Sequence, residues 1–63
     1  MTVQKYKIVS CDNDAQAAFD YKIVQLETRV NLFLEENDSF RVMGAPFKLD
    51  DCFVQVCVVS YKL

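Results

Sequence analysis

Histidine and tryptophan are absent from this sequence, and glycine and proline occur once each. Without histidine there is no Ser-His or Cys-His pair, which excludes the common forms of nucleophilic catalysis. Histidine ligands for zinc are excluded for the same reason, and no Cys-x-x-Cys pair is present. We therefore expect a protein that is not an enzyme and that uses no metal or other cofactor.

The cysteines are odd in number: Cys11, Cys52 and Cys57. No basic and apolar leader opens the chain, so the pattern predicts free thiols in a reducing, cytoplasmic compartment rather than a disulfide framework. No apolar run reaches the roughly 18 residues that a membrane span needs. The sequence therefore predicts a soluble cytoplasmic protein.

The 63 residues, of which 52% are hydrophobic, predict a single domain over residues 1–63. Folding a chain of this mass buries roughly 6,400 Å², and the apolar part of that area contributes on the order of 95 kcal/mol. Ordering the chain costs about the same. Very good packing or self-association is therefore needed for a stable fold.

The first segment alternates between β-branched or aromatic residues and polar residues, which predicts a half-buried strand over Thr2–Ser10. Tyr6 and Ile8 lie on one face of this strand. Lys5 and Lys7 lie on the other.

The period then changes to that of a helix, which we expect over Asp14–Glu36. Asn13 and Gln16 fit a capping box. The helix is about 34 Å long, which equals or exceeds the diameter of a compact domain of this size. Either its first turns separate near Asp20, or its end projects and meets a partner. The predicted apolar face consists of Phe19, Ile23, Leu26, Val30 and Phe33.

Two more strands follow, a short one over Phe40–Met43 and a strongly apolar one over Cys52–Leu63. Gly44–Pro46 ends or bulges the first of these, and Phe47–Asp51 is predicted to be a connection. The element order predicts an α+β fold of βαββ type, with one long helix on one face of a three-stranded mixed sheet of strand order 1-3-2. The first two strands then run parallel, and the most apolar strand lies in the centre.

The last strand is apolar on both faces. One face carries Val54, Val56 and Val58, and the other carries Phe53, Cys57, Val59 and Tyr61. One helix covers only one face, so the second face must be covered by loops and the first helical turns, by self-association, or by a different protein.

The strand order also brings the end of the first strand to the start of the third. We expect Cys11 close to Cys52, with both thiols reduced. Four carboxylates gather at the same edge, and we interpret them as turn and capping residues rather than as cation ligands. They belong to Asp12, Asp14, Asp50 and Asp51.

Several short stretches resemble a known family. They are Tyr6–Val9, Leu26–Asn31 leading to Phe40, Val42–Phe47 and Phe53–Val58. In these stretches the chain resembles the domain-of-unknown-function family numbered 1737, which consists of short domains of bacteria and their viruses. Ser39-Phe40 stands where that family has a Gly-Trp pair. The resemblance implies the βαββ fold and a bacterial or viral origin, and it implies no activity.

We predict a non-catalytic protein–protein interaction module that acts as a homo-oligomer such as a homodimer. In a viral setting it becomes a phage-type modulator or inhibitor of a host protein. The predicted partner-binding residues are three cations expected to share the outer sheet face, three acidic residues and three valines. They are Lys5, Lys7 and Arg41; Glu35, Glu36 and Asp38; and Val54, Val56 and Val58.

The alternative is a binder of a small anionic ligand at a site between protomers. Arg29, Arg41 and Tyr61 are its predicted ligand-binding residues. Nucleic acid is not an expected partner, because the net charge is −2 and the seven lysines and arginines are scattered along the chain.

Overall fold

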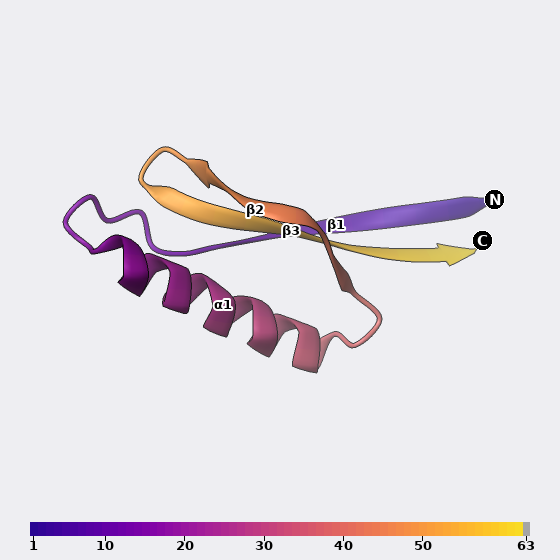
Figure 1. Ribbon diagram of the computed structural model, residues 1–63. Helices are drawn as coiled ribbons and strands as arrows, with labels where there is room; N and C mark the ends of the chain where they lie inside the picture. Colours follow the sequence, from indigo (N-terminus) through magenta and orange to yellow (C-terminus); the bar gives the residue numbers. More distant parts are fainter. Residues whose placement is uncertain (63) are drawn as a thin grey trace.

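The computed structural model describes residues 1–62. Along the chain the elements are β1 (Thr2–Ser10), α1 (Phe19–Glu36), β2 (Arg41–Leu49) and β3 (Cys52–Lys62). The helix lies on one face of a three-stranded sheet of order β1-β3-β2 (Figure 1). The predicted α+β fold of βαββ type and its 1-3-2 strand order are confirmed. Leu63, the predicted end of the last strand, lies outside the described residues.

The sheet is antiparallel throughout, so the predicted mixed sheet is wrong. β3 pairs antiparallel with β1 on one side, from Thr2 opposite Lys62 to Ser10 opposite Val54. It pairs antiparallel with β2 on the other side. β1 and β2 run in the same direction, as expected, but β3 separates them and they share no hydrogen-bond ladder.

The helix begins at Phe19 rather than at Asp14, in agreement with the first turns separating near Asp20. Its N-cap is Ala18, whose side chain makes no capping hydrogen bond, so the predicted capping box is not formed. Asp14 closes a local turn instead: its Oδ1 accepts a hydrogen bond from the backbone N–H of Gln16 at 2.9 Å.

β2 continues through its glycine and proline as a bulge. The ladder shifts register between Met43 and Phe47, and Gly44 adopts a φ of 73° that suits glycine. The amide of Gln55 holds this bulge, because its Nε2 donates to the backbone oxygens of Met43 and Gly44 at 3.3 and 3.1 Å. The buried Gln55 is thus a structural residue.

A tight turn at Asp50 and Asp51 joins β2 to β3. The predicted connection over Phe47–Asp51 is therefore wrong in its first part, because β2 extends to Leu49. The buried Lys22 of α1 reaches this turn and donates from Nζ to the backbone oxygen of Asp51 at 2.6 Å. This bond ties the start of the helix to the hairpin.

The core lies between α1 and the face of the sheet that carries Cys57. The apolar period of the helix places its buried side chains against β1 and β3. Two edge-to-face aromatic pairs close the ends of this layer, with ring centroids 5.1 and 5.0 Å apart. The core residues are Val9, Cys11, Leu26, Val30 and Cys57, and the pairs are Phe19 with Phe53 and Phe33 with Phe40.

The molecule is elongated, with a radius of gyration of 13.0 Å, whereas a compact chain of this length has about 10.6 Å. One cause is visible in Figure 1, where β1 and β3 extend together beyond α1 and β2. In that region Thr2–Lys5 pairs only with Val59–Lys62. The amino group of Lys5 lies 5.8 Å from the ring centroid of Tyr61 there.

Candidate interaction surface

The face of the sheet opposite the helix is apolar. Register places Ile8, Val56 and Met43 side by side across the three strands. The two adjacent rows each combine two apolar or aromatic side chains with one polar residue, Arg41 in one row and Ser10 in the other. We call this surface the open face. Its apolar and aromatic residues are Tyr6, Ile8, Met43, Phe47, Leu49, Val54, Val56 and Val58, and Ser10 and Arg41 also lie on it.

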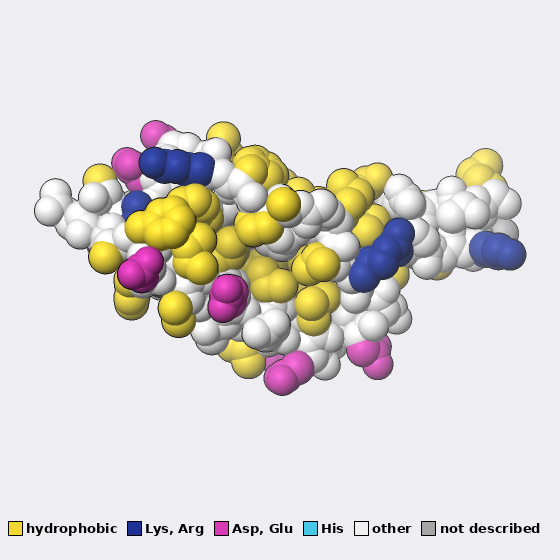
Figure 2. Space-filling view, in the orientation of Figure 1, with side chains coloured by type: hydrophobic (Ala, Val, Ile, Leu, Met, Phe, Trp, Pro, Cys, Tyr) yellow, Lys and Arg dark blue, Asp and Glu magenta, His cyan; other side chains and the backbone are white. Residues whose placement is uncertain are grey.

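No other segment of residues 1–62 covers the open face. The helix lies on the other side of the sheet, and the loop that precedes it extends past the ends of the strands, at the left of Figure 1. Ile8 is 61% exposed, and Tyr6, Met43, Phe47 and Leu49 are also exposed. Figure 2 shows hydrophobic side chains reaching the surface along the strands. The interpretation of β1 as half-buried is therefore correct for Val9 and wrong for the face that carries Tyr6 and Ile8.

The three predicted valines lie on the open face, but they form its floor. Val54 and Val58 are only 3% and 1% exposed. Val58 lies between Tyr6 and Arg41, and Val54 lies between Ser10 and Phe47. A protein that approaches this face first meets exposed side chains of β1 and β2 such as Tyr6, Ile8 and Phe47. These residues were not among the predicted partner-binding residues. The alternation of Tyr6 and Ile8 with lysines was visible in the sequence of β1, but it does not tell which of the two faces of the strand the helix covers.

The predicted cluster of three cations on one sheet face is wrong. Lys5 and Lys7 pair with Val59 and Cys57, so they share the face on which the helix packs. Arg41 pairs with Val58 and lies on the open face. The alternation of side chains along a strand separates the two groups.

The predicted acidic group lies at the end of the helix and just beyond it. Glu35, Glu36 and Asp38 are all exposed, and the helix is on the far side of the sheet from the open face. Among residues 1–62 none of these three carboxylates forms an ion pair. The acidic group and the open face are thus separate surfaces.

Both edges of the sheet carry features that oppose strand pairing with another protein. The β1 edge has Lys5 and Lys7. The β2 edge has a bulge at Gly44 and a proline, Pro46, which lacks an N–H donor. The open face has no comparable protection, since Arg41 is the one charged residue of β1 or β2 that it carries.

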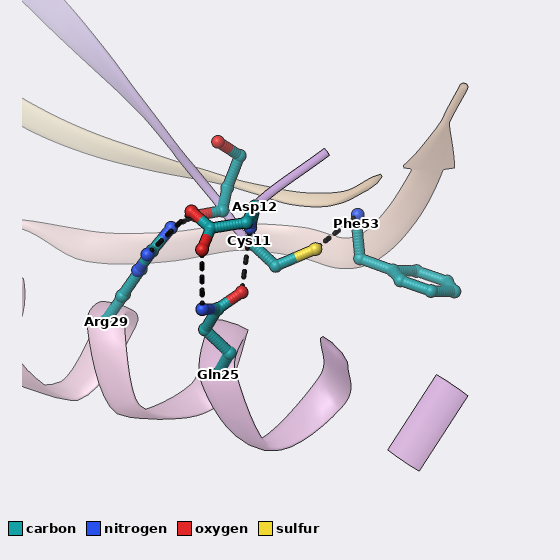
Figure 3. A network of polar contacts seen from close by, with 6 residues as sticks. Cys11, Asp12, Gln25, Arg29 and Phe53 are labelled. Atoms are coloured by element: carbon teal, nitrogen blue, oxygen red, sulfur yellow. Dashed lines mark hydrogen bonds and ion pairs between the residues drawn. The ribbon is translucent and has the colours of Figure 1, made fainter. Parts of the chain in front are cut away.

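A polar network joins the loop after β1 to the helix (Figure 3). Arg29 donates from Nη2 to Oδ1 of Asp12 and from Nη1 to the backbone oxygen of Ser10, both at 2.9 Å. Gln25 donates to Oδ2 of Asp12 at 3.1 Å and accepts from the backbone N–H of Asp12 at 2.8 Å. This network fixes the loop against α1 and explains why the helix starts late.

The same network bears on the predicted anion site. The guanidinium of Arg29 is already paired with a carboxylate, and it lies beside Ser10, opposite the start of β3. Tyr61 lies near the other end of β3, and Arg41 is on the opposite face of the sheet from Tyr61. The structure does not bring these three residues together within one chain.

Asp12 gives the network a dependence on pH. The hydrogen bond from Arg29, that from Gln25 and the positive charge of Arg29 hold the pKa of Asp12 below its usual value. Because the pKa is lower in the folded than in the unfolded chain, the ionised carboxylate stabilises the fold above about pH 4. This contribution is lost as the pH falls through the folded-state pKa. We expect Asp12→Asn to lower the urea midpoint at pH 7, and the difference from the wild type to shrink below about pH 4.

Asp14→Asn is the matched control for this measurement, since the Asp14 side chain accepts a hydrogen bond only from the backbone of Gln16 among the described residues. A difference between Asp12→Asn and the wild type that stays constant from neutral to acidic pH contradicts the role given to the carboxylate.

The edge where β1 ends and β3 begins matches the prediction that these strand ends meet. Cys11 donates from its N–H to the oxygen of Phe53, and the N–H of Phe53 approaches Cys11 Sγ, both at 3.1 Å. Cys52 is next to Phe53 in the chain, and all three cysteines are free thiols. Within residues 1–62 no group of three or more His, Cys, Asp or Glu side chains is placed to bind a metal ion.

A small groove lies between α1 and β2, with a volume of about 230 Å³. The helix packs on β1 and β3 rather than on β2, which leaves this space beside the bulge. The volume is below the roughly 300 Å³ at which small-molecule sites begin. Its lining residues are Leu26, Glu27, Val30, Asn31, Pro46 and Gln55.

The remaining comparisons concern membranes and known proteins. No helix among the described residues combines the length and the apolarity needed to cross a bilayer. No family model, curated protein or solved structure matches this chain. The resemblance to the domain-of-unknown-function family therefore stays a prediction.

Proposed function

We propose that this chain is a non-catalytic protein–protein interaction module whose contact surface is the open face. The observation that carries the proposal is that no helix covers the side of the sheet opposite α1, where five large hydrophobic side chains of β1 and β2 are exposed. A contiguous apolar patch of this kind is typical of a protein interface, because leaving it in water is unfavourable.

The proposal includes self-association as the mode of action. It also includes a cytoplasmic setting, which the three free thiols support because free thiols persist in a reducing compartment. The family resemblance adds a bacterial or viral origin, in which the module modulates or inhibits a host protein. The anion-binding alternative receives no support from the positions of its three predicted residues.

Site-directed photo-cross-linking in bacterial cells tests this proposal. A photoreactive phenylalanine analogue replaces Phe47 on the open face, and in a second variant it replaces Tyr21, which is equally aromatic and is exposed on α1. We expect irradiation to give a strong covalent adduct from position 47 and little from position 21.

The mass of the adduct identifies what covers the face. An adduct of two copies of the chain indicates self-association, and an adduct of another mass indicates a different protein. The absence of any adduct from position 47, while the protein remains folded in the cell, overturns the proposal.

A further inference from the structure

We infer that a second copy of this chain covers the open face by packing its own open face against it. The result is a two-fold sandwich in which two sheets lie between two outer helices. This inference rests on the proposed function, because it names the partner of the same surface. Four properties of the described residues support this arrangement, and the first of them favours a second copy over a different protein.

The first property is the lack of charge at the centre of the open face. The middle row, Ile8–Val56–Met43, is entirely apolar, and Arg41 is at the margin. Charged groups usually supply the selectivity for a different partner, and this centre has none. Interfaces between identical chains are on average more apolar than transient interfaces between different proteins. The face is therefore suited to pack against a copy of itself.

The second property is area. The open face follows β3 from Cys52 to Val58, with β1 beside it only from Val54 onward, and strands about 4.8 Å apart present roughly 300 Å² there in projection. Two such faces bury about 600 Å² before the relief of the side chains is counted, and the exposed side chains of Tyr6, Ile8 and Phe47 add to this area. The open face is thus of a size that suits a weak dimer, whose population depends on concentration.

The third property is an accessible surface area larger than that of a compact protein of the same mass. The accessible area of the described chain is 4625 Å², whereas a compact protein of this mass exposes about 4,200 Å². A chain of this length has little stability in reserve, and association is one way in which small domains complete their core. Covering the open face removes apolar surface from water in both copies at once.

The fourth property is that the sheet edges disfavour the competing mode, in which two copies join edge to edge. Two antiparallel copies of β1 centred on Tyr6 place Lys5 opposite Lys7, so that like charges face each other. The bulge at Gly44 and the proline Pro46 interrupt the other edge. Association through the open face avoids both obstacles.

A two-fold axis that lies between the two faces and passes near Val56 places the middle row of one copy over that of the other. Aligned sheets in such sandwiches cross at about 30°. Each side chain of an isologous interface occurs twice, so that one substitution changes two contacts.

Sedimentation equilibrium of the purified chain over a range of concentrations tests the inference. The variants are Ile8→Lys on the open face and Val24→Lys on α1, whose side chains are 61% and 59% exposed. Because Ile8 is exposed in a single chain, lysine is accommodated there without a buried charge. We expect the wild type and Val24→Lys to sediment at about twice the 7.3 kDa chain mass. We expect the Ile8→Lys dimer to dissociate at a concentration at least about a hundredfold higher than the wild-type dimer does.

A second measurement covers the case in which the separated chain does not stay folded. If folding and dimerisation are coupled, the urea midpoint of the wild type rises with protein concentration. A wild type that is monomeric with a midpoint independent of concentration overturns the inference, as does a dimer that Val24→Lys dissociates and Ile8→Lys does not. The proposed function fails separately, through the absence of any cross-link from position 47.

Discussion

Replacing Leu26 by alanine is expected to unfold a large fraction of this protein at 25 °C. Leu26 is 3% exposed and packs in the core cluster between α1 and the sheet. Truncating a buried leucine to alanine costs about 2–5 kcal/mol, because the lost burial adds to the cavity that remains. A core of this size rarely supplies more than about 3–5 kcal/mol in total. Urea unfolding followed by the far-ultraviolet circular dichroism of the helix measures the effect.

Leu32→Ala is the matched control. It is the same substitution in the same helix, but the Leu32 side chain is 53% exposed. Its free energy of unfolding should stay within about 0.5 kcal/mol of the wild type. Equal losses in the two variants would mean that the helix does not pack on the sheet through Leu26.

Replacing Cys57 by serine is expected to lower the free energy of unfolding by about 2 kcal/mol. The Cys57 side chain is completely buried at the centre of β3, and burial raises the pKa of its thiol. Among residues 1–62 its sulfur makes no hydrogen bond, so that it acts as a small apolar group. A serine hydroxyl there loses its bonds to water without gaining a partner, which costs about 1–3 kcal/mol.

Cys52→Ser provides the comparison, since it also replaces a sulfur by an oxygen, but at a site where the thiol has a hydrogen-bond acceptor. The thiol of Cys52 is partly exposed and donates to the backbone oxygen of Leu49 at 3.3 Å. Serine keeps a donor in this position, and we expect almost no change in the urea midpoint. If Cys57→Ser is as stable as Cys52→Ser, then water reaches the centre of the sheet.

The elements with clear periodicity were predictable. The alternation in Thr2–Ser10 gave the bounds of β1, and the apolar run after Asp51 gave β3 and its central place. The repeat of apolar residues up to Glu36 gave the end of the helix. These signals are local, because each strand or helix carries its own period.

Elements held by contacts distant in sequence were not predictable in the same way. The helix begins late because the bonds of Asp12 with Gln25 and Arg29 hold the preceding loop against the helix. The helix propensity of the intervening residues contains no information about these bonds. β2 is longer than predicted because Gln55 in the neighbouring strand holds its bulge. Arg29 has the character of an anion ligand in the sequence, but in the fold its partner is a carboxylate of the same chain.

The sequence by itself determined the α+β class, the strand order and the excess of apolar residues over what one helix covers. Only the tertiary structure decided which side of the sheet the helix takes. Both faces of β3 are apolar, so periodicity does not choose between them, and the register of the strands makes the choice. That register places Cys57 under α1 and leaves Ile8, Val56 and Met43 on the open face. Contacts between segments distant in the chain thus created the candidate interaction surface.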